Sequence, residues 1–165
     1  YTLVYTLSLH DALPISADIT IPEGAEKIDD LFASRIETVG KDPEHADYFK
    51  VFGESGTLNG YVLPLQGPGL WGTIEAVVGF DAKMEAYTGV EFTDQNETPG
   101  LGGRITEEWF KEQFRGKQPP FELVPEGTAS GNDEVDAITG ATRTSNFVQQ
   151  LMLKAADRVK QVVEG

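Results

Sequence analysis

The middle of the chain alternates apolar and polar residues with a period of two, which is typical of β-strands. Four such runs are rich in β-branched and aromatic residues and are separated by glycine, asparagine or serine. They read DYFKVF (47–52), GYVLPLQ (60–66), GTIEAVVGFD (72–81) and AYTGVEFTD (86–94). Because strands with short connections pair with their neighbours, we expect an antiparallel meander. A further brief strand is expected at residues 121–124.

A helical period of three to four residues marks three other segments. The first starts at Pro22 and has its apolar positions at Ala25, Ile28, Leu31, Phe32 and Ile36. A short helix is expected over residues 105–114, with Thr106 as its N-cap. The third helix is long and ends near Gly165, and its apolar positions are Phe147, Val148, Leu151, Met152, Ala155, Val159 and Val162. This order predicts an α+β domain in which helices flank an antiparallel-rich sheet of about four to five strands.

Composition narrows the possible classes of function. The chain has 165 residues, enough for one domain with a core, and a net charge of −14, which repels phosphate backbones and argues against nucleic acid as a partner. Cysteine is absent, which excludes disulfides, thiolate metal sites and cysteine nucleophiles. The carboxylates are scattered as on a solvated surface, so we expect no metal site. No apolar run is long enough to span a bilayer.

The first residues do not belong to this pattern. Residues 6–15 read TLSLHDALPI, which is the translation of a common sequencing-library adapter. We therefore interpret residues 1–16 as a non-native, adapter-coded segment and set them aside. The domain is expected to comprise residues 17–165, and its true N-terminus is expected to be missing.

Two familiar patterns fail on their context. GPGLWG, residues 67–72, matches G-x-G-x-x-G, but the residues after it are strand-like and offer no helix start to a pyrophosphate. We interpret it as a loop between two strands. A hydrolase with a threonine nucleophile would need a nearby base, and the two histidines are His10 in the adapter-coded segment and His45 in a turn. This reading is the least favoured.

Two glycine-containing segments remain as candidate chemistry. ETPGLGG, residues 97–103, follows a strand, and its glycines would let backbone N–H groups approach a ligand, although an ordinary turn has the same composition. DAITGAT, residues 136–142, immediately precedes the long helix.

Two interpretations of this helix start stay open. In one, Thr144 or Ser145 caps the helix and the other hydroxyls are incidental. In the other, the helix terminus holds a phosphate-sized anion, which small residues allow to approach the backbone and which Arg143 or Arg104 helps to neutralise.

DAITGAT resembles the flavinylation motif D-x-x-[ST]-G-A-T of the FMN-binding domain family. ETPGLGG, the Trp109 that follows it, and GPGLWG upstream are similar to other landmarks of that family, in the same order. The resemblance covers residues 17–165. Within the family it favours the C subunits of sodium-translocating NADH:quinone oxidoreductases, with the G subunits of Rnf complexes as close relatives.

In that family a separate flavin transferase moves FMN from FAD onto a threonine hydroxyl. The resemblance implies that Thr142 carries covalent FMN through a phosphoester. Recognition and seating of the phosphate are expected of Asp136, Thr139, Gly140 and Ala141, and Thr144 is expected among the other cofactor-binding residues. The residues expected beside the isoalloxazine are Glu97, Thr98, Gly100, Leu101, Gly102, Gly103, Leu70 and Trp71.

The resemblance also implies a role and a location. The domain would relay electrons among the subunits of a membrane NADH:quinone reductase that moves sodium, on the extracytoplasmic (periplasmic) face of the bacterial inner membrane. It would not be catalytic alone, and its native membrane anchor would be missing from this sequence. The alternatives are an Rnf component, a free-standing extracytoplasmic FMN-binding redox protein, or an acidic interaction domain without a redox role.

Overall fold

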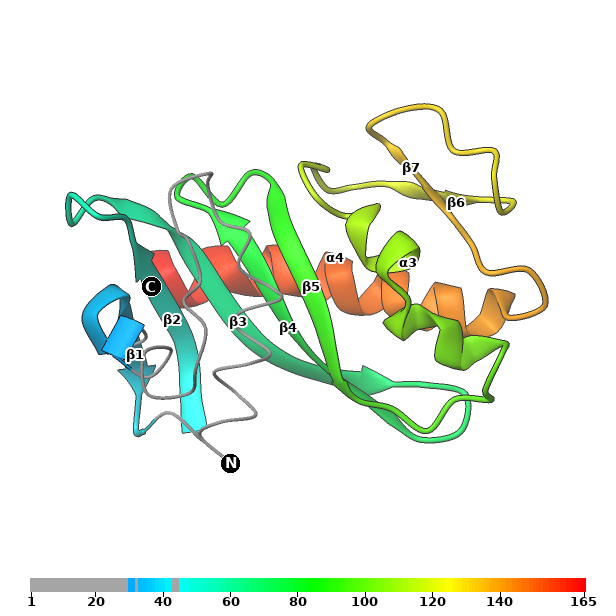
Figure 1. Ribbon diagram of the computed structural model, residues 1–165, viewed down its shortest axis with the longest axis horizontal. Helices are drawn as coiled ribbons and strands as arrows, with labels where there is room; N and C mark the ends of the chain where they lie inside the picture. Colours follow the sequence, from blue (N-terminus) through cyan, green and yellow to red (C-terminus); the bar gives the residue numbers. More distant parts are fainter. Residues whose placement is uncertain (1–29, 32, 43–44) are drawn as a thin grey trace.

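The computed structural model describes residues 30–31, 33–42 and 45–165. Its main feature is a five-stranded sheet with the order β1-β2-β3-β4-β5, in which every neighbouring pair is antiparallel. The strands are β1 (Ile36–Gly40), β2 (Ala46–Phe52), β3 (Leu58–Pro68), β4 (Thr73–Asp81) and β5 (Tyr87–Asp94). The predicted meander is confirmed, and Figure 1 shows it as the sheet in front of the long helix.

β1 is the strand of the five-stranded sheet that the sequence pattern did not predict. Ile36 was expected on the apolar face of the first helix, but it begins β1 and pairs with Val51 of β2. The β-branched residues of this segment, Ile36, Thr38 and Val39, suit the edge of a sheet, so pairing with β2 prevails over the helical spacing. Residues 30–31 and 33–35 are helical, and the rest of that predicted helix lies outside the described residues.

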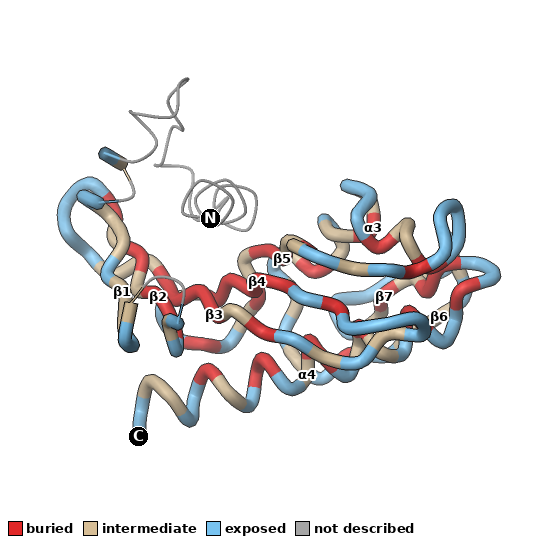
Figure 2. The backbone as a smooth tube through the Cα atoms, turned by 90° about the horizontal axis from the view of Figure 1, so that it is seen from below, coloured by how far each residue is buried: buried red, intermediate tan, exposed pale blue. Residues whose placement is uncertain are grey.

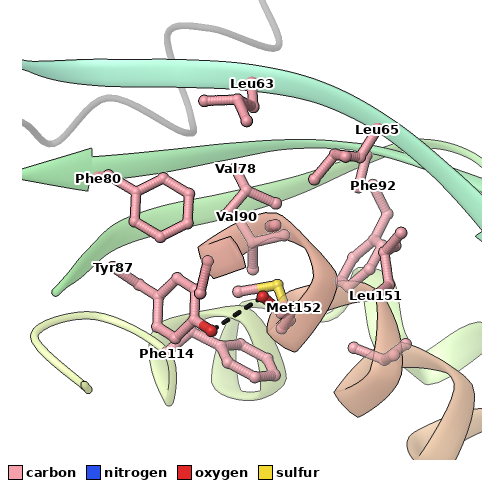
Figure 3. Packing of buried hydrophobic residues seen from close by; sticks show 14 of the residues in the cluster. Leu63, Leu65, Val78, Phe80, Tyr87, Val90, Phe92, Phe114, Leu151 and Met152 are labelled. Atoms are coloured by element: carbon pink, nitrogen blue, oxygen red, sulfur yellow. Dashed lines mark hydrogen bonds between the residues drawn. The ribbon is translucent and has the colours of Figure 1, made fainter. Parts of the chain in front are cut away.

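The long helix α4 (Thr142–Glu164) lies across one face of the sheet. Its buried turns point toward the strands in Figure 2, as the apolar spacing of three and four predicts. In the core, shown in Figure 3, the hydroxyl of Tyr87 donates a hydrogen bond of 2.9 Å to the backbone oxygen of Met152. Burial raises the pKa of this hydroxyl.

A 3-10 turn, η2 (Gly102–Thr106), and a short helix, α3 (Glu108–Glu112), follow the sheet. The prediction that Thr106 caps this helix is wrong. The N-cap residue is Glu107, without a side-chain cap, and the Thr106 hydroxyl instead donates to the backbone oxygen of Gly103. Because η2 comes directly before α3, the hydroxyl is used within the preceding turn.

Two short strands complete the fold near the start of α4. β6 (Glu122–Val124), which the sequence predicted, pairs in parallel with β7 (Glu134–Asp136), which it did not. A connection leads from β7 directly into α4, so this pair positions the helix start (Figure 1). Within the described ranges, no helix combines the length and the apolar character that crossing a bilayer requires.

Candidate cofactor site

Three loops that are distant in the sequence meet at the N-terminal end of α4. They are the turn between β3 and β4, the glycine-rich residues 97–103, and the segment 138–141. Between them lies a cavity of about 300 Å³, a size at the lower end for small-molecule sites. It is lined by Leu70, Glu97, Thr98, Leu101, Gly102, Gly140, Ala141, Thr142, Arg143 and Thr144.

Glu97 holds these loops together. Its side chain is buried, with 5% of the residue exposed, and Oε1 accepts hydrogen bonds from the backbone N–H groups of Leu70 (2.8 Å) and Trp71 (3.0 Å). Its Oε2 accepts a hydrogen bond of 2.5 Å from the hydroxyl of Thr144 in α4. A buried carboxyl group is costly unless hydrogen-bonded, and here three protein donors satisfy it. Glu97 was expected beside the flavin, and the structure gives it an organising role within the cavity wall.

Two glycines make room for this carboxyl group. A Cβ at Gly69 would lie 2.6 Å from Glu97 Oε1. A Cβ at Gly102 would lie 2.6 Å from Thr144 Oγ1 and 2.9 Å from Glu97 Oε2. Side chains at these two positions would therefore collide with the hydrogen bonds that join the loops.

The hydroxyl residues at the start of α4 do not cap it. The N-cap is Ala141, without a side-chain hydrogen bond, so Thr144 and Ser145 lie inside the helix and their prediction as caps is wrong. The helix begins earlier than its apolar pattern because a turn leads straight into it. Ser145 Oγ then accepts a hydrogen bond of 3.0 Å from the backbone N–H of Ile138 in that turn.

Thr142 is the first residue of α4, is exposed, and lines the cavity. The first N–H groups of an α-helix have no acceptor within the helix, and the helix dipole is positive at this end. Arg143, also exposed, is the one cationic residue in the cavity lining. The other cation considered, Arg104, forms ion pairs with Glu107 and Glu126 outside that lining.

Five expected site residues lie outside the lining: Gly100, Gly103, Trp71, Asp136 and Thr139. Asp136 Oδ1 accepts the backbone N–H groups of Thr128 (2.9 Å) and Ala129 (2.8 Å), which shapes the loop before β7. The N–H of Thr139 donates to Glu126 Oε2 at 2.7 Å. No sequence pattern pointed to Glu126, because it lies in an irregular loop and 22 residues separate it from Arg104.

The edge of the cavity is apolar and open to solvent. Three large hydrophobic residues are exposed in the described part of the chain: Leu70 (37%), Trp71 (68%) and Leu101 (43%). Leu70 and Leu101 line the cavity, and Trp71 is adjacent to Leu70 in the turn that Glu97 holds. The cavity thus lies between the start of α4, whose first N–H groups have no acceptor within the helix, and an apolar edge.

The fold and the site define an α+β domain whose glycine-rich loops meet the start of a long helix. Comparison with known protein families identifies the family. The family model described as "FMN-binding domain" matches residues 69–157, which is more than half of the chain. The chain therefore belongs to the FMN-binding domain family.

Individual relatives are more specific. The chain is 38% identical over 112 residues to the C subunit of the Na(+)-translocating NADH-quinone reductase of Yersinia pestis, and the match covers 62% of this chain and 42% of the relative. It is 32% identical over 114 residues to the same-named protein of Neisseria meningitidis serogroup A, covering 64% and 44%. The chain thus spans less than half the length of these curated relatives.

Solved structures agree with the fold. The crystal structure of Shewanella oneidensis NqrC superposes with a TM-score of 0.77 at 26% identity, covering 92% of this chain and 91% of that one. The structure of the same-class C subunit from Parabacteroides distasonis gives a TM-score of 0.65 at 22% identity and supports the fold alone. The predicted α+β fold with a long C-terminal helix is confirmed.

The residues present fit an FMN group. The open start of α4 and Arg143 would hold its phosphate, and the close packing at Gly102 and Gly140 leaves backbone rather than side chain at the cavity wall. Leu70 and Leu101 would contact the apolar surface of the ring system.

Proposed function

We propose that this chain is an electron-transfer subunit that carries FMN covalently, through a phosphoester to the hydroxyl of Thr142. One observation carries the proposal: Thr142 is exposed at the first turn of a 23-residue helix and lines a cavity with an apolar edge. A phosphate attached there would meet the free N–H groups of α4. When bound, FMN supplies the one- and two-electron redox chemistry, which the protein side chains lack.

The attachment reaction needs FAD and a separate flavin transferase. The Thr142 oxygen would bond to the phosphorus of the FMN moiety, the pyrophosphate bond would break, and AMP would leave while the hydroxyl proton is released. The resulting diester keeps one negative charge. A chain with a net charge of −14 accommodates this charge more readily than a phosphate dianion.

Thr142, Arg143 and the neighbouring backbone would then orient the phosphate, while the turn with Leu70 and Trp71 would exclude water from one side of the ring. Glu97 would keep that turn and Thr144 in fixed positions relative to each other. Because burial and hydrogen bonds set the electronics of a bound cofactor, these residues would also tune its potential.

We infer that the electrons pass between other subunits of a membrane NADH:quinone reductase that transports sodium, on the extracytoplasmic side of the bacterial inner membrane. Similarity to proteins named as the C subunit of that reductase supports this assignment over the G subunit of an Rnf complex. The isolated chain should not oxidise NADH, because GPGLWG forms the end of β3 and a turn into β4 and offers no helix start to a dinucleotide.

The test is flavinylation of the 165-residue chain by a purified flavin transferase with FAD, read by intact mass and by flavin fluorescence after denaturation. The wild type should gain one FMN less one water, mapped to Thr142 by peptide sequencing. Thr142→Val removes the hydroxyl and keeps the side-chain shape, so it should abolish the modification and leave the circular dichroism unchanged. Thr93→Val, which removes a hydroxyl from β5 outside the cavity lining, should be modified fully.

The transferase must modify a control substrate in the same assay. If the wild type then remains unmodified, the result contradicts the covalent attachment of FMN to this chain. Denaturation-resistant flavin in Thr142→Val would contradict the acceptor assignment alone.

A further inference from the structure

Hydrogen bonds also hold the turn that comes directly before Thr142. The preceding turn, Ile138 to Ala141, closes with a hydrogen bond of 2.9 Å from Ala141 N–H to the Ile138 oxygen. Its third residue, Gly140, has a φ of +79°, which a glycine adopts without strain. On the buried side, Ser145 Oγ accepts the N–H of Ile138. The core side of the turn is therefore held by α4 itself.

The solvent side of the turn is held by a residue outside both motifs. Glu126 Oε2 accepts the backbone N–H of Thr139 at 2.7 Å. Hydrogen bonds from Arg104, and then from the backbone and hydroxyl of Thr139, lower the pKa of Glu126 to about 2. The carboxylate of Glu126 therefore holds the backbone of the turn at Thr139.

Arg104 in turn holds Glu126. Its guanidinium group donates to both carboxylate oxygens, at 3.0 and 3.2 Å, in a bidentate pair that restricts the geometry. Its Nε donates to Glu107 at 3.3 Å, and its Cζ lies 5.1 Å from the ring centroid of Trp109. A continuous series of contacts therefore runs from η2, next to the glycine-rich loop, to the turn that leads into α4.

We propose that Glu126 and Arg104 are positioning residues for flavinylation: they hold the turn at Thr139 so that the Thr142 hydroxyl is presented in the geometry that phosphoryl transfer requires. This inference rests on the proposed function. In-line attack at phosphorus depends on small displacements of the nucleophile, so loosening a turn three residues away should slow the transfer. Neither residue touches the reacting atoms, and both act through the backbone of Thr139.

The experiment compares initial flavinylation rates of wild type, Glu126→Gln and Glu126→Ala at saturating FAD. Glutamine keeps an oxygen for the Thr139 N–H, whereas alanine removes it, so the rate should fall in that order. We expect about a tenfold loss in Glu126→Ala, the equivalent of one hydrogen bond. The matched control is Glu112→Ala, which removes the ion pair between Glu112, the last residue of α3, and Arg115; neither residue lines the cavity. It should retain the wild-type rate.

Two further measurements separate positioning from general damage. Arg104→Gln should lower the flavinylation rate when it is introduced into the wild type. It should change the rate little in the Glu126→Ala background, because the two residues act as one unit. In the chain without flavin, hydrogen exchange at the Thr139 amide should accelerate in Glu126→Ala and remain unchanged in Glu112→Ala.

Equal flavinylation rates for Glu126→Ala and Glu112→Ala would overturn the inference while leaving the proposed function intact. Additive losses in the double variant, or an unchanged exchange rate at Thr139, would also count against it. An absence of flavinylation in the wild type would reject the proposed function itself; the exchange measurement would then still decide whether Glu126 holds the turn.

Discussion

The two ends of α4 are held in the fold by different kinds of contact. From Val148 to Val159 the helix buries apolar side chains against the sheet (Figure 3). From Thr142 to Ser145 it is held through individual hydrogen bonds, to Glu97 and to Ile138. The first region has many interchangeable contacts, and each polar contact of the second has a single donor and acceptor.

This difference separates stability from precision. Apolar burial is roughly proportional to area and tolerates substitution of similar volume, so the core gives the fold its free energy without dictating one geometry. A hydrogen bond between buried groups contributes less net energy but specifies distance and direction. We therefore expect core variants to change stability, and variants of the loop contacts to change the site more than the fold.

The largest effect is expected in the core. Phe80 is fully buried in β4, with its ring 5.1 Å from that of Tyr87. Phe80→Ala should lower the free energy of unfolding by about 3–5 kcal/mol through lost burial and the cavity that remains. Urea unfolding followed by circular dichroism measures this, with Trp71→Ala as the exposed control, expected within about 0.5 kcal/mol of wild type. Flavinylation per folded molecule should stay unchanged in Phe80→Ala. If flavinylation per folded molecule also falls, the core affects the site as well as stability, and the distinction between the two regions fails.

A smaller effect is expected where the loops meet α4. In Gly102→Ala the new Cβ would displace the Glu97–Thr144 contact, costing about 1–3 kcal/mol and lowering the flavinylation rate. Gly100→Ala is the matched variant: its φ is +74°, but no atom lies within 4 Å of the added Cβ. Its cost, about 1 kcal/mol, comes from backbone strain alone, and the flavinylation rate should persist. If both variants flavinylate equally, the packing at Gly102 does not matter to the site.

The elements that the sequence predicted correctly are those with a clear hydrophobic period. Alternation located β2 to β5, and the apolar spacing located α4, because each element buries one face and the pattern follows directly. β1 was not predicted because Ile36 also fitted a helical spacing. β7 was not predicted because a strand of three residues is too short to show a period. The caps were wrong at both helices, since a preceding 3-10 turn or β-turn decides where a helix starts.

The candidate site was predicted through motif resemblance, and the structure brings together the residues that line one cavity from three loops. What the motifs could not reveal is the direction of individual hydrogen bonds. Glu97 uses both oxygens on protein donors, and the backbone N–H of Thr139 donates to Glu126. Such pairings depend on the tertiary approach of segments 13 to 47 residues apart, for which a single sequence carries no signal.

The smallest effect concerns the charge on Glu126. Its folded-state pKa is lowered from 4.5 to about 2, chiefly by the hydrogen bond from Arg104. A lowered carboxyl pKa stabilises the fold at any pH above the unfolded value, and this contribution is lost as the pH falls through about 2. The stability difference between wild type and Glu126→Gln should therefore be constant above pH 5 and shrink below about 4.5. Urea unfolding at pH 6, 4 and 3 measures it. Glu112→Gln should show a pH trend of the same sign, because the hydrogen bond from Arg115 also lowers the pKa of Glu112, and it serves as the comparison for an ion pair that does not contact Thr139. A difference that stays constant between pH 6 and 3 would show that the turn depends on the shape of Glu126 and not on its charge.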